Sequence, residues 1–319
     1  MRFEGIYTPV ITPFHTDGTI DHDAFARMLD HLIDSGVHGI VLGGTTGEYY
    51  AQTSEERIAM MHLAVDRIAG RVPLVIGVSA LRTEDAAMYA GHAREAGADA
   101  ILIGSPYYAV PTEREIALHC LEVERAADLP VMLYNFPSRT GVMMGDEFLD
   151  RVGRNPNFCA IKESSGDINR LHALARDYPH IQACCGMDDQ ALEYFAWGAR
   201  AWVCAGSNFL PAEHIALYQA CVVEGDFSRG RRIMSAMLPL MRTLEQGGKF
   251  LQSIKHGVRY AGLPAGPVRK PLRELNKDEA RALETTIRTL QTSIRQIERT
   301  AADTSTNNRE AENVRTANA

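Results

Sequence analysis

The chain has 319 residues, of which 45% are hydrophobic and 23% charged, and its formal net charge is −7 at pH 7. This composition is typical of a globular protein with a substantial core and excludes a disordered or collagen-like chain. A mildly acidic protein lacks the positive surface that binds nucleic acids and anionic membranes, so we expect neither as a partner.

No apolar run approaches the roughly 18 residues of a membrane span. The N-terminal segment carries Glu4, Pro9 and Pro13 where a signal peptide needs an apolar stretch. The six cysteines have no paired spacing, and most lie in apolar runs, which indicates buried, reduced thiols rather than disulfides or a zinc site. We therefore expect a cytoplasmic protein.

Short apolar runs alternate with amphipathic segments along the first two thirds of the chain. The predicted strands cover residues 5–12, 39–44, 73–78, 99–104, 130–135, 158–163, 181–186 and 201–206. Between them the periodicity is helical, with Asp21, Ser54 and Thr83 expected as N-caps and Gly36 and Gly97 as helix ends. Apolar strands that are each followed by a helix indicate a parallel sheet covered on both faces.

Eight such units in about 225 residues predict an α/β fold, the (β/α)8 TIM barrel. A doubly wound open sheet is the main alternative, but the segment after the first strand, TPFHTDGT, has no glycine-rich phosphate motif. We assign residues 1–224 to the barrel, because the predicted helix 211–224 closes it. Predicted helices 227–246, 249–261 and 277–297 form a C-terminal helical domain, residues 225–299. The polar residues 300–319 are predicted to be a disordered tail.

In a TIM barrel the active site lies where the strands end. Reactive or hydrogen-bonding side chains occupy these positions, including Thr45, Thr46, Tyr108, Tyr134, Lys162 and Asp188. None of the eleven histidines has a partner at metal-ligand spacing, so no metal site is predicted.

Lys162 ends the apolar run Phe158–Ile161 and is expected to face a cavity of low dielectric constant. Desolvation there disfavours the ammonium form, and a neutral lysine is a nucleophile that forms Schiff bases with carbonyl groups. The alternative is a structural ion pair with Glu163 or Asp188. Tyr134, one strand away, is either a general acid and base or a core tyrosine with a satisfied hydroxyl.

Two other positions suit the binding of a carboxylate. The hydroxyls and backbone N–H groups of Thr45 and Thr46 can form an anion-binding nest, or can belong to a simple turn. Arg139 can offer its planar guanidinium to a substrate carboxylate, or can be a surface charge.

Four strings occur together in order: GGTTGE from Gly43, SPYYxxP from Ser105, YNFPSRTG from Tyr134 and IKESSGD from Ile161. Over residues 3–295 the chain closely resembles the dihydrodipicolinate synthase and N-acetylneuraminate lyase family of class I Schiff-base lyases. The arginine in YNxPxRTG is typical of the dihydrodipicolinate synthase branch.

The resemblance implies a role for each matching residue. Lys162 forms the imine with pyruvate, and Tyr134 shuttles protons to and from it. Thr45 and Tyr108 complete a proton relay, with Tyr108 supplied by a neighbouring subunit. Thr46 binds the pyruvate carboxylate, the backbone of Val203 lines the pocket with Gly186, and Arg139 binds the carboxylate of the second substrate.

The implied reaction condenses pyruvate with aspartate 4-semialdehyde to 4-hydroxy-tetrahydrodipicolinate. It uses no metal or organic cofactor, because the covalent imine on Lys162 serves as the electron sink. The resemblance also implies a homotetramer built as a dimer of dimers.

Two departures from the family pattern leave a second function open. Tyr49 and Tyr50 follow GGTTGE where synthases commonly have small residues, and Leu81 replaces a polar contact of lysine-inhibited members. The alternative is a catabolic 2-oxo acid aldolase, dehydratase or deaminase acting on a sugar acid or a hydroxyproline-derived acid. A non-catalytic binding barrel is disfavoured because Lys162 and Tyr134 are both present.

Overall fold

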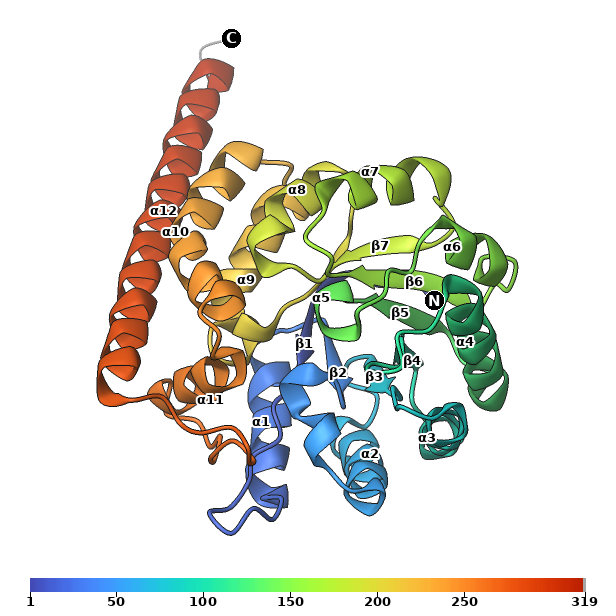
Figure 1. Cartoon of the computed structure of the whole chain (residues 1–319). Coiled ribbons are helices and arrows are strands. Elements are labelled where there is room, and N and C mark those ends of the chain that lie inside the picture. Colours follow the sequence, from blue (N-terminus) through green and yellow to red (C-terminus); the bar gives the residue numbers. More distant parts are fainter. Residues whose placement is uncertain (318–319) are drawn as a thin grey trace.

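The computed structural model describes residues 1–317, with side chains up to residue 301. Eight parallel strands form a closed barrel in which each strand pairs with the next and β8 pairs with β1 (Figure 1). The strands are β1 (Gly5–Pro9), β2 (Gly39–Leu42), β3 (Leu74–Gly77), β4 (Ala100–Gly104), β5 (Val131–Asn135), β6 (Phe158–Glu163), β7 (Gln182–Cys185) and β8 (Ala201–Val203). The predicted TIM barrel is therefore confirmed.

Helices follow the strands around the barrel, and three more helices follow the last βα unit (Figure 1). They are α1 (His22–Asp34), α2 (Ser54–Ile68), α3 (Thr83–Ala96), α4 (Glu113–Ala127), α5 (Pro137–Thr140), α6 (Asp146–Val152), α7 (Ile168–Asp177), α8 (Ala191–Ala196), α9 (Pro211–Tyr218), α10 (Phe227–Gln246), α11 (Phe250–Tyr260) and α12 (Lys277–Ala317). A π-helical turn, Gln219–Val223, extends α9.

The predicted helix starts were correct at one of three positions. The Asp21 side chain caps α1 by accepting a hydrogen bond from the Ala24 backbone, at 2.8 Å. Thr53, not Ser54, caps α2, because its hydroxyl pairs with the backbone of Glu56 in a reciprocal capping box. Thr83 is the first residue of α3 rather than its cap. At the other end of α3, Gly97 adopts φ +96°, as expected of a helix-terminating glycine.

The core has two layers, as expected for strands buried on both faces. One layer fills the barrel and includes Tyr7, Val41, Leu102, Met132 and Ala160. The other, larger layer lies between the barrel and the surrounding helices. Because side chains alternate along a strand, each strand contributes to both layers.

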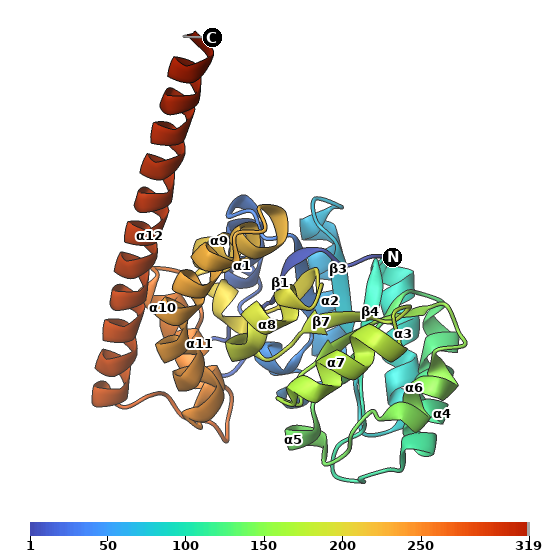
Figure 2. The same ribbon diagram turned by 90° about the horizontal axis from the view of Figure 1, so that it is seen from above.

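The C-terminal helices cover one side of the barrel. Helix α10 packs on α8, α9 and the short turn after β7, while α12 runs along α10 and α11 (Figures 1 and 2). The separation of residues 225–299 as a domain of their own stays a prediction. Residues 300–317, for which the sequence predicts a disordered tail, instead continue helix α12 as far as Ala317, and the rest of the predicted tail lies outside the described residues.

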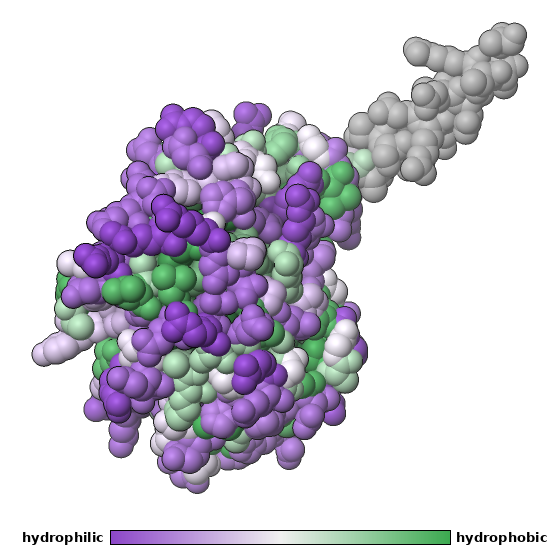
Figure 3. Space-filling model, turned by 90° about the vertical axis from the view of Figure 1, so that its right-hand side faces the viewer, coloured by the Kyte–Doolittle hydropathy of each residue, from purple (hydrophilic) through white to green (hydrophobic). Residues whose placement is uncertain are grey.

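The side of the molecule that carries α3, α4 and α6 is largely hydrophilic, with separate apolar patches (Figure 3). Exposed apolar side chains in this part of the chain include Met88 of α3 and Leu118 of α4. Within the described part of the chain, no helix combines the length and the apolar character needed to cross a bilayer.

Candidate active site

The carboxyl ends of the strands converge on a small cavity of about 30 Å³. All predicted site residues except Tyr108 line it: Thr45, Thr46, Tyr134, Arg139, Lys162, Gly186 and Val203. A larger cavity of about 360 Å³ adjoins it and shares the lining residues Thr45, Tyr134, Phe136 and Arg139. The arrangement gives a confined compartment at Lys162 next to a roomier entrance.

Lys162 points into the barrel near the end of β6, and only 8% of it is exposed. Its Nζ lies 4.2 Å from the centre of the Tyr134 ring, which sits opposite it in the register of β5 and β6. Among the residues described with side chains, no acidic group lies within ion-pair distance of Lys162. The alternative that the sequence allowed, a structural ion pair of Lys162 with Glu163 or Asp188, is therefore not formed.

Glu163, the first of the two possible partners, is committed elsewhere. It is fully buried, and its carboxylate accepts hydrogen bonds from Asn135 Nδ2 at 2.8 and 3.0 Å and from the Ser165 backbone at 2.7 Å. Arg170 Nε lies 3.8 Å from the same carboxylate. Glu163 thus fixes the ends of β5 and β6, and leaves the amine of Lys162 free for chemistry.

Asp188, the second possible partner, lies in the turn after β7. Its Oδ1 accepts a hydrogen bond from Trp202 Nε1 at 2.9 Å. Burial raises the pKa of the Asp188 carboxyl, and the bond from Trp202 and the charge of Lys162 only partly oppose this rise. Asp188 therefore lines the cavity as a buried acid without forming a close ion pair with Lys162.

Gly186 leaves room for the Lys162 side chain. A Cβ atom at position 186 would lie 2.8 Å from Lys162 Cγ, 2.9 Å from the Glu163 carbonyl oxygen and 2.1 Å from Ser164 Oγ. The Ser164 hydroxyl can rotate away, but the lysine stem and the backbone carbonyl cannot yield without moving β6.

We expect Gly186→Ala to lower kcat/KM by about 100-fold, because an error of about 1 Å in the position of a reacting group costs that much. Steady-state kinetics measure the effect, and a thermal melt checks that the variant is folded. Gly91→Ala, on α3, is the matched control, since its added Cβ meets nothing within 4 Å. Wild-type kinetics of the Gly186 variant would contradict this interpretation.

Thr45 and Thr46 belong to a single 3₁₀ turn, Thr45–Gly47, that follows β2. The turn is held from outside, because the Gly47 carbonyl accepts hydrogen bonds from Thr12 Oγ1 and Gln52 Nε2, both at 2.8 Å. Thr46 is buried, and both threonines line the small cavity. The turn therefore places hydroxyl and N–H groups at the cavity, where they can meet a carboxylate.

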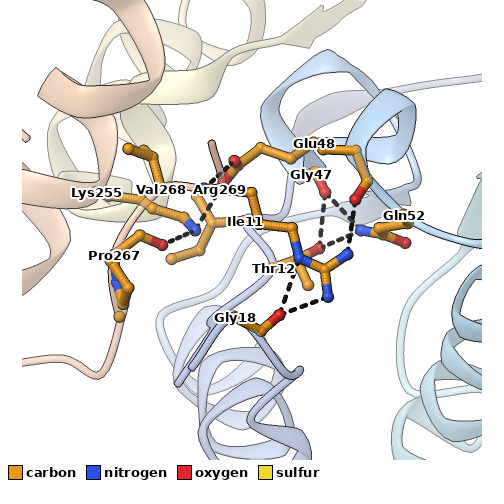
Figure 4. Close-up of polar contacts among 12 residues, drawn as sticks. Ile11, Thr12, Gly18, Gly47, Glu48, Gln52, Lys255, Pro267, Val268 and Arg269 are labelled. Atoms are coloured by element: carbon orange, nitrogen blue, oxygen red, sulfur yellow. Dashed lines mark hydrogen bonds and ion pairs between the residues drawn. The ribbon is translucent and has the colours of Figure 1, made fainter. Parts of the chain in front are cut away.

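A buried ion pair that the sequence did not reveal ties this turn to the C-terminal helices (Figure 4). Glu48, in the left-handed conformation at φ +57°, lies 2.6 Å from Lys255 Nζ of α11, and both side chains are fully buried. Glu48 Oε2 also accepts a hydrogen bond from the Arg269 backbone at 2.9 Å. Because breaking a buried pair costs about 3–5 kcal/mol, α11 fixes the position of the turn.

Arg139 lies on α5, a single helical turn that starts at Pro137 and ends at Thr140, and the following Gly141 adopts φ +76°. The proline at the first position and the glycine after the last explain why the string NFPSRTG forms one isolated turn. Arg139 Cζ lies 5.2 Å from the centre of the Phe136 ring. In the part of the chain with described side chains, the guanidinium has no acidic partner within 4.0 Å, so its planar donors are available to a ligand.

Tyr108 lies apart from the other predicted residues. It is 94% exposed, adopts φ +72°, and lines neither cavity, whereas its neighbour Tyr107 lines the larger one. A strained backbone that presents a tyrosine to solvent is unusual, and such strain clusters at functional sites. Within the single chain, Tyr108 does not reach Tyr134.

Two further cavity residues come from the C-terminal helices. Glu245 lies in the last turn of α10 and Phe250 is the first residue of α11. The sequence predicts a C-terminal helical domain over this region, but it contains no motif that would place these two side chains at the barrel. In the residues described with side chains, no cluster of histidine, cysteine or acidic groups could hold a metal ion.

Comparison with known proteins supports the family resemblance seen in the sequence. Residues 2–290 match the sequence model of the Dihydrodipicolinate synthetase family. A 4-hydroxy-tetrahydrodipicolinate synthase of Exiguobacterium sibiricum is 35% identical over 285 residues, which cover 89% of this chain and 97% of that protein.

Solved structures agree with the sequence comparison. The 4-hydroxy-tetrahydrodipicolinate synthase of Methylacidiphilum fumariolicum superposes with a TM-score of 0.88 at 30% identity, over 93% of this chain and 99% of the other. A prophage protein of Escherichia coli K12 that belongs to the dihydrodipicolinic acid synthase family, solved in complex with pyruvate, gives 0.85 at 30% identity, over 91% and 99%.

Proposed function

The chain belongs to the dihydrodipicolinate synthetase family, and we propose that it condenses pyruvate with aspartate 4-semialdehyde through a Schiff base on Lys162. The product is 4-hydroxy-tetrahydrodipicolinate. Family members are class I Schiff-base lyases, in which a lysine imine takes the place of a metal or an organic cofactor.

The observation that carries this proposal is the state of Lys162. Its amine is buried in a cavity of about 30 Å³, next to Tyr134, with neither Glu163 nor Asp188 in ion-pair contact. An amine that is shielded from water and not neutralised by an acid is suited to attack a carbonyl carbon. The turn containing Thr46 lies on the same cavity, where it can hold the carboxylate of a 2-oxo acid.

The reaction can be followed through the residues in place. The amine of Lys162 adds to C2 of pyruvate, and the carbonyl oxygen leaves as water after it has received one proton from the amine and one from Tyr134, so that a protonated imine forms. The protonated imine draws electrons from the C3–H bond, so that C3 loses a proton and an enamine forms. C3 then attacks the aldehyde carbon, and the aldehyde oxygen takes up a proton as the new C–C bond forms. The α-amino group of the aldehyde substrate, once it has lost a proton, adds to C2 of the imine and displaces the amine of Lys162, which closes the ring of the product and frees the enzyme.

Arg139 is proposed to bind the carboxylate of the aldehyde substrate. We expect Arg139→Ala to raise KM for aspartate 4-semialdehyde by about 10- to 100-fold, because a charged hydrogen bond contributes about 1.5–3 kcal/mol. KM for pyruvate should change far less, since Thr46 and not Arg139 is assigned to its carboxylate. Steady-state kinetics with each substrate varied in turn measure the two KM values. Equal increases in the KM for aspartate 4-semialdehyde and the KM for pyruvate would contradict the assignment.

Turnover with purified substrates tests the function as a whole. Pyruvate and aspartate 4-semialdehyde are compared with a panel of hydroxylated and cyclic 2-oxo acids, which represent the catabolic reactions of the same chemistry. Faster turnover of a panel member than of the pyruvate and semialdehyde pair would replace the proposed substrate. Even if the second substrate had to be replaced, exchange of the C3 protons of pyruvate in D₂O would show whether the enzyme still forms an imine with pyruvate.

We further propose a homotetramer, a dimer of dimers, in which Tyr108 completes the proton relay of a neighbouring subunit with Thr45 and Tyr134. Its 94% exposure supports this arrangement, as do the exposed apolar side chains of Val110, close to it in the chain, and of Leu81 in the loop after β3. A cytoplasmic location is proposed as well, supported by six cysteines that are all free.

A further inference from the structure

Two consecutive glycines place an acidic residue over the mouth of the barrel. Helix α10 ends at Gln246, Gly247 and Gly248 form the turn, and α11 starts at Phe250. Gly248 adopts φ +72°, and a Cβ on Gly247 would lie 2.3 Å from the Thr243 carbonyl oxygen, so a tight reversal of this kind needs glycine. As a result, Glu245 lines the small cavity together with Lys162 and Arg139.

The side chain of Glu245 is unpaired within the described part of the chain. Among the residues described with side chains, none forms a hydrogen bond with its carboxylate or an ion pair within 4.0 Å. Arg139 and Lys162 are near enough for their charges to act on it, yet neither contacts it directly. A glutamate that served only to stabilise α10 or its packing would be expected to have a partner, as Glu224 has in Arg229 at 2.6 Å.

The surroundings of Glu245 are already negative. Burial and the charges of Asp188 and Asp189 raise the pKa of the Glu245 carboxyl, and Lys162 and Arg139 only partly oppose this. The negative charge grows during the reaction, because two substrate carboxylates enter while the protonated imine on Lys162 carries a single positive charge. A cationic group on the second substrate would offset this negative charge and favour the carboxylate form of Glu245.

We propose that Glu245 binds the α-ammonium group of the second substrate and so restricts this site to aldehydes that are also α-amino acids. The inference rests on the proposed function, because it takes aspartate 4-semialdehyde as that substrate. The ammonium and carboxylate of an α-amino acid share one carbon atom and must be met by two groups close together. Arg139 and Glu245 line one cavity and are not paired with each other, which leaves both free to meet the two charges.

The test compares two aldehydes that differ only in the ammonium group, aspartate 4-semialdehyde and succinate semialdehyde. The enzyme is first loaded with pyruvate. The rate of C–C bond formation at low aldehyde concentration is then followed by borohydride trapping and mass spectrometry of the lysine adduct. For Glu245→Gln we expect a roughly 10- to 100-fold lower rate constant with aspartate 4-semialdehyde, the loss of one charged contact. With succinate semialdehyde the rate constant should stay the same or rise.

The neighbouring residue provides the matched control. Gln246 is exposed and lines neither cavity, so Gln246→Glu alone should change nothing. The double variant Glu245→Gln/Gln246→Glu restores the net charge and the helix-end carboxylate, but outside the cavity, and should be as impaired as Glu245→Gln. Recovery in the double variant would overturn the inference.

The remaining outcomes separate this inference from the proposed function. Equal losses with the two aldehydes, or no loss with either, would overturn the role of Glu245 and leave the synthase reaction standing. If the wild type exchanged the C3 protons of pyruvate but added neither aldehyde, the second substrate would be wrong, and the inference would fall with it. Absence of C3 exchange would refute the imine chemistry itself.

Discussion

Lys162→Ala is expected to abolish the covalent step and to lower kcat by roughly 10⁴- to 10⁶-fold, as removal of a catalytic nucleophile does. Pyruvate and borohydride should leave a reduced adduct on the wild type and inactivate it, but should leave the variant unmodified. Intact-mass spectrometry measures the adduct, and a coupled assay measures the remaining turnover. Lys162→Met serves as a second variant, because it keeps most of the buried stem without the amine.

Peptide mapping makes this test specific, because the chain contains only five lysines. Lys255 is the informative competitor. Burial lowers its pKa to about 8, which on acidity alone would make it a nucleophile. However, Lys255 lies 2.6 Å from the Glu48 carboxylate, donates to the Pro267 carbonyl oxygen at 2.8 Å, and lines neither cavity. The adduct should therefore map to Lys162, and an adduct on Lys255 would contradict the assignment.

The barrel could be predicted because its strands are buried on both faces. Runs such as GIVL and AILIG have no polar residue that would require one face of the strand to lie in water, as in most antiparallel sheets. Eight such runs with helical segments between them therefore favour a parallel barrel covered by helices. Helix ends were less certain. Thr53 rather than Ser54 caps α2 because Glu56 pairs with it reciprocally, and adjacent hydroxyl residues give nearly the same local signal.

The residues of the site were predictable where a strand end imposes their position. Lys162 and Tyr134 follow from the strand pattern, since each lies near the end of its strand, whereas Gly186, just after β7, was assigned to the pocket through the family resemblance. Glu245 was not predictable in this way, because it belongs to a helix far along the chain. Only the packing of α10 on the turn after β7 and the reversal at Gly247 bring it to the cavity.

The ion pair of Glu48 and Lys255 escaped prediction for the same reason. The two residues are far apart in sequence, and neither has a neighbour that signals a buried charge. Their pairing depends on where α11 crosses the barrel rim. Long-range contacts of this kind are set by tertiary packing. From the sequence alone, a charged residue in a turn or in an amphipathic helix is expected to be exposed to solvent.

The hydroxyl of Tyr134 has no hydrogen-bond partner among the residues described with side chains, although the ring is half-buried beside Lys162. A tyrosine with only a packing role would be expected to have its hydroxyl satisfied. Its position on the cavity instead fits a group that gives and takes protons at the substrate.

Tyr134→Phe should accordingly lower kcat by about 10²- to 10⁴-fold, the usual contribution of a positioned general acid or base. KM for pyruvate should change little, because the ring and the turn of Thr46 remain. The pyruvate adduct should still form on Lys162, but more slowly, which stopped-time borohydride trapping measures. Tyr7→Phe is the control, since it removes the same hydroxyl from an inward-facing tyrosine of β1 that lines neither cavity. A Tyr134→Phe enzyme with the wild-type rate would leave Tyr134 only its packing role, and the proton would have to come from another group on the cavity.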